Sequence, residues 1–126
     1  MVLYHLARDL MLVARVSASA RQAGRRYQSF PSADALIAAL TKEDGSGADG
    51  INSGPFRILV DLQLPGLVSD ELMAGIRETG APCEVVAYAQ HVFTDLLESA
   101  KAAGIPKVMT RGQFDRHVDD LVAGSL

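Results

Sequence analysis

The most constraining feature of the sequence is a mostly apolar run at its centre, FRILVD at residues 56–61. Its apolar side chains are consecutive rather than alternating, which is typical of a parallel strand that is covered on both faces. Shorter runs of the same kind occur at residues 2–6 (VLYHL) and 84–88 (EVVAY). Because such strands need a helical layer above and below them, the runs together predict a layered α/β fold.

Helical patterns separate these runs. Apolar residues recur at steps of three and four over residues 10–23, with Asp9 as a candidate N-cap and Gly24 as the stop. Similar stretches follow at residues 32–40, 69–76, 94–103 and 114–122, and weaker strand candidates lie at residues 26–30 and 107–110. The order is five strand–helix units, which predicts a five-stranded, doubly wound parallel sheet with helices on both faces.

Composition limits what the chain can be. It has 126 residues, 48% of them apolar and 21% charged, and this balance predicts one globular domain over residues 1–126. Twelve basic and fifteen acidic residues give a net charge of −3, which offers no support for nucleic-acid binding. No apolar run approaches the roughly 18 residues of a membrane span, and no signal-peptide pattern is present. We therefore expect a cytoplasmic protein that binds neither nucleic acid nor membrane.

Residues 41–56 differ from the rest of the chain. They contain four glycines together with Asp, Asn and Pro residues, which predicts a long, turn-rich loop. The P-loop motif is missing, and no Rossmann-type glycine motif opens a helix. We therefore expect a surface linker, of a length that is unusual inside a small domain.

In an open parallel sheet, ligand-binding and reactive residues lie at the carboxyl ends of the strands. Asp61 ends the central strand directly, and its carboxylate is therefore the first candidate for a functional group. His5 lies inside the first strand and is interpreted as structural. His91 follows the fourth strand, and we interpret it as an exposed loop histidine in preference to an acid, a base or a phosphate donor.

The segment ILVDLQLPG at residues 58–66 resembles the phosphoacceptor segment of response-regulator receiver domains. In that family an aspartate ends the third strand and a hydrophobic loop with Pro-Gly follows. The strand–helix order, the chain length, VVAYAQH at residues 85–91 and AAG at residues 102–104 fit the same family. The resemblance covers essentially the whole chain. It implies the flavodoxin-like (CheY-like) fold and a role in two-component signalling or phosphorelay, with Asp61 as the phosphoacceptor.

Most of the family's other functional positions are substituted here. The acidic pair that holds Mg²⁺ after the first strand corresponds to Leu6 and Ala7, which offer no side-chain oxygen to a hard cation. The hydroxyl residue that ends the fourth strand corresponds to Ala89. The lysine after the fifth strand corresponds to Arg111, which keeps only the positive charge, and the aromatic switch residue corresponds to Val108. Of the functional set, only the aspartate that accepts the phosphoryl group is clearly kept.

These substitutions take away the charge neutralisation on which phosphoryl transfer depends, so we expect Asp61 to be phosphorylated slowly or not at all. We expect no metal; if one binds, its ligands are Asp9, Asp61 and the backbone carbonyl of Gln63. Arg8 and Arg111 flank the site, and we hypothesise that one of them replaces the metal as a permanent counter-ion to Asp61. The alternative is that both arginines are solvated and that Asp61 meets water or backbone amides.

The resemblance and its departures together predict a degenerate receiver-like signalling domain, not an enzyme and without a cofactor, that acts through protein–protein contacts. The family's usual docking surface corresponds to residues 94–123, which we expect to bind a protein partner or a second copy. The alternative is an active receiver that is phosphorylated at Asp61 with Mg²⁺, using Asp9 as a displaced ligand. A small-ligand or flavin-binding domain ranks last, because Leu6, Ala7 and Arg8 do not make a flavin-phosphate loop.

Overall fold

The strand order of the sheet places the middle of the chain at the centre of the fold. The computed structural model describes residues 1–46 and 55–126, and in them five parallel strands lie in the order β2-β1-β3-β4-β5. The strands are β1 (Val2–Leu6), β2 (Arg26–Phe30), β3 (Phe56–Asp61), β4 (Cys83–Ala89) and β5 (Lys107–Thr110). The prediction of a five-stranded, doubly wound parallel sheet is confirmed.

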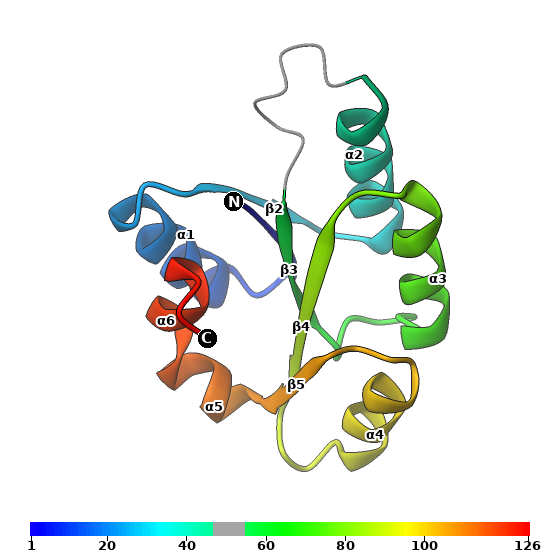
Figure 1. The fold of residues 1–126 in the computed structure, drawn as a ribbon. Coiled ribbons are helices and arrows are strands. Elements are labelled where there is room, and N and C mark those ends of the chain that lie inside the picture. Colours follow the sequence, from blue (N-terminus) through cyan, green and yellow to red (C-terminus); the bar gives the residue numbers. More distant parts are fainter. Residues whose placement is uncertain (47–54) are drawn as a thin grey trace.

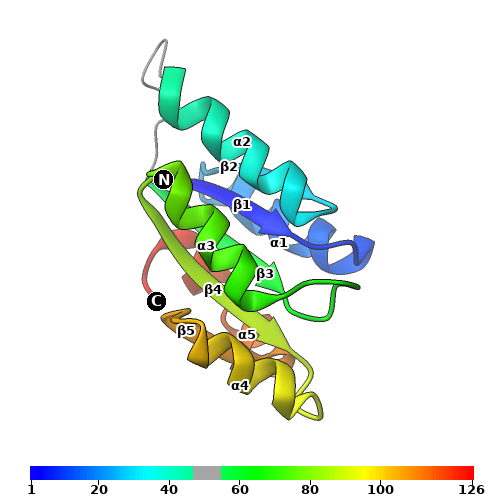
Figure 2. The ribbon, with the colours of Figure 1, turned by 90° about the vertical axis from the view of Figure 1, so that its right-hand side faces the viewer.

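Helices cover both faces of this sheet, as Figures 1 and 2 show. One layer contains α1 (Leu10–Gln22), α5 (Arg111–Arg116) and α6 (Val118–Ala123), and the other contains α2 (Ala33–Ser46), α3 (Ser69–Thr79) and α4 (Thr94–Ala102). The order of the strands reverses between β1 and β3. In open α/β sheets the crevice at the carboxyl ends of such strands is where ligands bind.

The apolar core is divided between the two faces of the sheet. Leu36 of α2 and Leu72 of α3 belong to one buried cluster, and Val16 of α1 and Phe114 of α5 belong to the other. All residues of β1 and β3 are buried, because these strands lie inside the sheet and helices cover both their faces. Side chains of one strand point alternately to the two faces, so each central strand contributes to both clusters.

Polar side chains cap the starts of the first two helices, and Asp9 does so where the sequence predicts. Asp9 precedes α1 with an extended backbone, and its Oδ1 accepts hydrogen bonds from the backbone N–H groups of Met11 (3.0 Å) and Leu12 (3.2 Å). The Oγ of Ser32 accepts a hydrogen bond from the backbone N–H of Ala35 (3.2 Å). Both side chains therefore satisfy N–H groups that have no partner inside the helix.

Part of the segment predicted as a loop at residues 41–56 is helical. Helix α2 continues to Ser46, so residues 41–46 are helical, and residues 47–54 lie outside the described part of the chain. Lys and Glu at positions 42 and 43 are good helix formers, whereas Asp, Gly and Ser at positions 44–46 are not, so propensity alone does not explain the extension. With 14 residues, α2 is the longest described helix. No helix in the described residues is long and apolar enough to cross a membrane.

The single amphipathic helix expected around residues 114–122 is in fact two short helices. Thr110 and Gln113 form a capping box that begins α5 at the end of β5. The helical turn becomes tighter at His117. The backbone N–H of His117 donates to the carbonyl oxygens of both Gln113 and Phe114 (3.1 Å each). Such sharing is common where a helical turn tightens at a terminus. Both short helices still bury apolar residues against the same face of the sheet.

Candidate functional site

The predicted site residues follow strands whose carboxyl ends lie along one edge of the sheet. In the parallel register Asp61 is level with Tyr88, and Ala89 is level with Thr110. The loops and helices that continue from these strands carry the remaining candidates, Arg8, Asp9, Gln63 and Arg111. Helices α1 and α5 both start at this edge and lie in the same layer. The topology therefore gathers the candidates around the crevice that the sequence analysis identified.

Asp61 is a buried carboxylate at the end of β3, with 8% of its surface exposed. Its Oδ1 accepts a hydrogen bond from the backbone N–H of Gln63 (2.9 Å). Burial raises the pKa of Asp61, since it penalises the ionised form. The Gln63 hydrogen bond and the positive charge of Arg111 oppose this shift, and the negative charge of Asp9 adds to it. Asp61 is therefore hydrogen-bonded to the loop that follows β3. Its pKa also depends on the charges of Asp9 and Arg111, which form an ion pair beside it.

That neighbouring ion pair joins Asp9 to Arg111. The Nη2 of Arg111 donates a hydrogen bond to Oδ2 of Asp9, while Oδ1 of Asp9 remains the N-cap of α1. The side chains are 32% exposed for Asp9 and 34% exposed for Arg111, so solvent partly screens the pair. The Arg111 hydrogen bond lowers the pKa of Asp9, and the backbone N–H groups of α1 lower it further. Both carboxylate oxygens of Asp9 are thus engaged within the protein.

Neither flanking arginine forms a direct ion pair with Asp61 within the described residues. Arg111 begins α5 and meets Asp9 at the start of α1, because these two helices cover the same face of the sheet. Its effect on Asp61 acts through space. Arg8 is exposed and lines an open groove between α2 and α3. The structure thus differs from the hypothesis of a direct arginine counter-ion.

The side chain of Gln63 ties two loops of the site together. Its Oε1 accepts a hydrogen bond from the backbone N–H of Gln90 (2.7 Å), which joins the loop after β3 to the loop after β4. The backbone N–H of Leu62 also donates to the carbonyl of Tyr88 (3.0 Å). These bonds continue the pairing of β3 with β4 beyond the ends of the strands. The sequence predicted a role only for the backbone carbonyl of Gln63, and this role of its side chain was not predicted.

Apolar groups occupy the three positions that the resemblance to receiver domains matches with that family's polar residues. Leu6 and Ala89 are fully buried, and Ala7 is 4% exposed. Their side chains add no oxygen to the crevice. Thr110 does carry a hydroxyl near this edge, but its Oγ1 caps α5 by accepting from the backbone N–H of Gln113 (3.2 Å). The polar groups available beside Asp61 are therefore few.

These residues do not fit a magnesium ion. Mg²⁺ requires oxygen ligands in near-octahedral geometry. Of the three candidate ligands, Asp9 uses both its carboxylate oxygens on protein donors. The backbone carbonyl of Gln63 supplies only one neutral oxygen. No group of three or more His, Cys, Asp or Glu side chains in the described residues is placed to hold a metal ion. Asp61 remains as a single carboxylate, which is too few ligands for a dedicated site.

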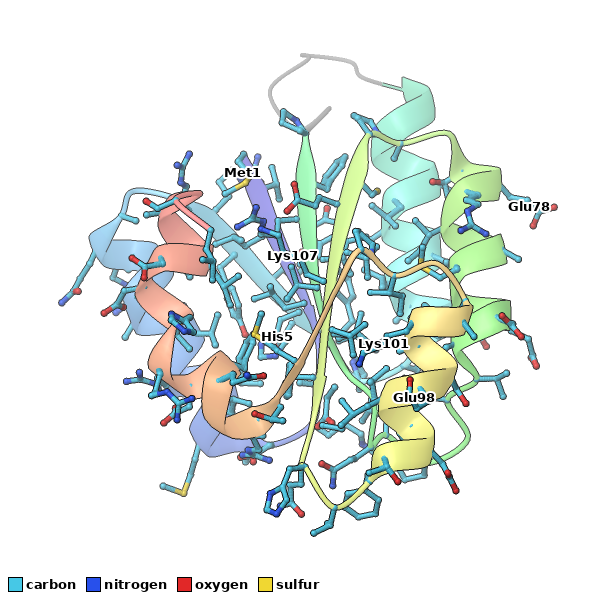
Figure 3. The ribbon with its side chains drawn as sticks, turned by 60° about the horizontal axis from the view of Figure 1, so that its bottom comes forward. Met1, His5, Glu78, Glu98, Lys101 and Lys107 are labelled. Atoms are coloured by element: carbon cyan, nitrogen blue, oxygen red, sulfur yellow. The ribbon has the colours of Figure 1, made fainter. Side chains whose placement is uncertain are left out.

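A buried polar network behind the crevice was not predicted. His5 is completely buried in β1 (Figure 3), and its ring joins two tyrosines: Nδ1 lies 2.7 Å from the hydroxyl of Tyr27 and Nε2 lies 2.8 Å from that of Tyr88. Burial lowers the pKa of His5 to about 4, with the charge of Asp9 opposing the shift. The imidazole is therefore neutral at neutral pH, with one nitrogen donating and the other accepting.

The partners of His5 come from strands on opposite sides of β1. Tyr27 lies on β2, and Tyr88 lies on β4 beyond β3. The ring of Tyr88 stacks on Phe114 of α5, with centroids 4.1 Å apart. The sequence did carry a signal for such a network, because a histidine inside an apolar buried strand needs partners for both its nitrogens. It could not identify those partners, which only the strand order brings together.

Comparisons with known proteins agree with this architecture. No protein-family model matches the sequence, and no curated protein matches it either. The structure superposes on a response-regulator receiver domain from Rhodospirillum rubrum with a TM-score of 0.72 and 16% identity, covering 99% of this chain and 93% of that one.

Two further solved structures are similar over most of their length. The receiver domain of a Pseudomonas aeruginosa sensor histidine kinase, solved with a magnesium ion in its active-site cleft, gives a TM-score of 0.68 at 13% identity, covering 95% of both chains. The receiver domain of a Saccharomyces cerevisiae response regulator, crystallised with a histidine phosphotransfer protein, gives 0.68 at 15% identity, covering 95% of this chain and 87% of that one. The chain therefore has the fold of response-regulator receiver domains.

Proposed function

We propose that the chain is a receiver-type signalling domain that works through protein–protein contacts, without Mg²⁺-dependent phosphorylation of Asp61. The observation that carries the proposal is the ion pair of Asp9 with Arg111. The acidic side chain nearest to the family's metal-binding position serves as a helix cap and as the counter-ion of an arginine. It is therefore not free to hold a cation beside Asp61.

The charges around Asp61 support the same conclusion. Phosphoryl transfer to a carboxylate depends on groups that neutralise the oxygens of the incoming phosphoryl group. Among the described residues, Arg111 is the only cation that influences the pKa of Asp61, and its guanidinium is already bound to Asp9. The position of the family's hydroxyl group is taken by Ala89, which is buried and apolar. The carboxylate thus lacks partners that would stabilise the transferring group.

A protein partner is supported by the exposed edge formed by residues 94–123. β5 is an edge strand and is half-buried along its whole length, beside α4 (Figure 3). Lys101 on α4 and Lys107 on β5 lie around it, and the exposed side chains of Val92 and Phe93 precede α4. Apolar residues surrounded by charged groups are typical of protein interfaces. The yeast receiver domain of similar fold was crystallised with a protein partner, which supports the same class of ligand here.

The decisive experiment is an NMR titration of the whole chain with Mg²⁺, with and without beryllofluoride, a phosphoryl mimic. We expect no saturable shift of the amides of residues 6–9 and 61–63 at millimolar Mg²⁺ and no response to beryllofluoride. Asp61→Asn is the matched control, since it keeps the shape of the side chain and removes its charge. A saturable response in the wild type that Asp61→Asn abolishes would instead support an active receiver phosphorylated at Asp61.

The docking surface has a separate test. A photo-crosslinking residue placed at Val108, which is half-buried on β5, should form an adduct with a partner protein. The same residue placed at Gln28, exposed on β2 at the opposite edge of the sheet, serves as the control and should not. Adducts from position 28 alone would move the interface away from residues 94–123.

A further inference from the structure

Gln63 forms hydrogen bonds with both its backbone and its side chain at the edge of the crevice. Its backbone N–H donates to Oδ1 of Asp61 (2.9 Å), and its side-chain Oε1 accepts from the backbone N–H of Gln90 (2.7 Å). The loops after β3 and β4, which carry these residues, leave the sheet at the same end (Figure 2). Gln63 therefore connects the carboxylate at the end of β3 to the loop that leads into α4.

The loop after β4 is a turn that begins at Gln90. The carbonyl of Gln90 accepts a hydrogen bond from the backbone N–H of Phe93 (3.0 Å), as in a β-turn. The carbonyl of Phe93 accepts in turn from the backbone N–H of Leu97 in α4 (3.2 Å). Phe93 is the N-cap of α4, and its side chain makes no capping bond. The start of α4 therefore depends on the backbone of this turn, whose first residue is bonded to Gln63.

The turn exposes two large apolar side chains. Val92 is 64% exposed and Phe93 is 40% exposed, and both directly precede α4, the first element of the docking surface at residues 94–123. A loop that is already held in its bound conformation loses less conformational entropy when a partner binds. The conformation of the turn thus affects how well this surface binds a partner.

Few other contacts can hold the turn in place. All the residues at positions 90–93 are exposed, whereas Gln63 is half-buried. Among the described residues, Gln63 is the one whose side chain hydrogen-bonds to the backbone of this turn. Its own backbone is fixed by the bond to the buried carboxylate of Asp61. The chain of bonds therefore runs from a buried anchor to an exposed loop.

We infer that Asp61 and Gln63 form a fixed latch, which holds the turn at residues 90–93, and with it the start of the docking surface, in one conformation. Asp61 anchors the backbone of Gln63, and the side chain of Gln63 holds Gln90. The carboxylate thus serves as a hydrogen-bond acceptor, and no phosphoryl signal is needed to order the surface. The inference rests on the proposed function for the use of this surface in docking, but the latch itself does not.

NMR amide exchange of the whole chain in EDTA tests the latch, because the Gln90 N–H exchanges when its hydrogen bond opens. Gln63→Met keeps the length of the side chain and removes the acceptor, so the Gln90 amide should exchange about two- to tenfold faster, as the loss of one hydrogen bond predicts. Gln63→Glu keeps an oxygen acceptor and should retain at least the wild-type protection. Gln28→Met is the matched control, since Gln28 is exposed on β2 at the edge of the sheet, and it should change nothing. The Ala7 amide, bonded to the carbonyl of Phe30 (3.1 Å), is the internal reference.

Two substitutions of Asp61 test the anchor in the same assay. Asp61→Asn keeps a side-chain oxygen that accepts from Gln63, so the Gln90 amide should stay protected, whereas Asp61→Ala should release it. A phosphoacceptor would be lost in both variants.

The latch is overturned if Gln90 exchanges at the wild-type rate in Gln63→Met, or if Gln63→Glu exchanges as fast as Gln63→Met. Asp61→Asn that exchanges as fast as Asp61→Ala would remove Asp61 as the anchor. Neither Mg²⁺ nor a partner takes part, so these failures are distinct from a failure of the proposed function, which the beryllofluoride titration and the crosslinking detect.

Discussion

The buried histidine of β1 makes the stability of the fold depend on pH. The pKa of His5 is about 4 in the folded protein, against an ordinary value of 6.5. As the pH falls below 6.5, the unfolded chain takes up the proton while the folded protein does not, so folding stability is lost progressively down to about pH 4. By linkage, the loss amounts to about 2 kcal/mol at pH 5 and about 3 kcal/mol at pH 4.

Urea unfolding of the wild type and of His5→Gln between about pH 7.5 and pH 5 measures this effect. The amide of glutamine offers one donor and one acceptor to the two tyrosines but does not titrate. The wild type should lose about 2 kcal/mol more than the variant over this range. Asp9 and Asp61 also titrate with shifted pKa values, but they do so in both proteins and cancel in the comparison. Equal pH slopes in the two proteins would refute the reasoning.

Two further substitutions probe the charged groups of the fold. Arg57→Met removes a buried guanidinium that donates to Glu84 (2.6 Å) and to a backbone carbonyl of α6 (2.7 Å). Because that carbonyl loses its donor, urea unfolding should show a loss of about 1–3 kcal/mol. Glu84→Gln is the comparison: its amide oxygen still accepts a hydrogen bond, but the buried guanidinium loses its paired charge, so the loss should be at least as large, and a loss near zero would contradict this account. Arg111→Met should raise the pKa values of both Asp9 and Asp61, since the guanidinium lowers each of them, and carboxyl-carbon NMR titration measures both. An unchanged Asp61 titration would show that the arginine does not act on it through space.

The elements that the sequence predicted best are those in which the pattern of apolar residues reflects burial directly. The run at residues 56–61 is apolar because β3 lies inside the sheet, and its position in the fold follows from that fact alone. The helix boundary that was not predicted lies where the spacing of apolar residues does not change. The apolar stripe from Phe114 to Val122 continues across the break at His117, so periodicity cannot distinguish one helix from two.

The candidate site was predicted in position but not in its contacts. Asp61 could be placed because it ends a recognisable strand. The pairing of Asp9 with Arg111 could not, since 102 residues separate them and only the shared layer of α1 and α5 brings them together. The same holds for Gln63, whose bond to the loop after β4 depends on which strands are neighbours. Long-range side-chain partners follow from topology, which a single sequence reveals only in outline.

The place of β1 between β2 and β3 also bears on how the protein is made. During synthesis β2 becomes available soon after β1, whereas β3 spans Phe56–Asp61. Until that segment leaves the ribosome, β1 presents an uncovered row of backbone donors and acceptors next to apolar side chains. Such an edge pairs readily with other chains. A nascent chain at this stage therefore exposes a strand edge that the finished sheet covers with β3.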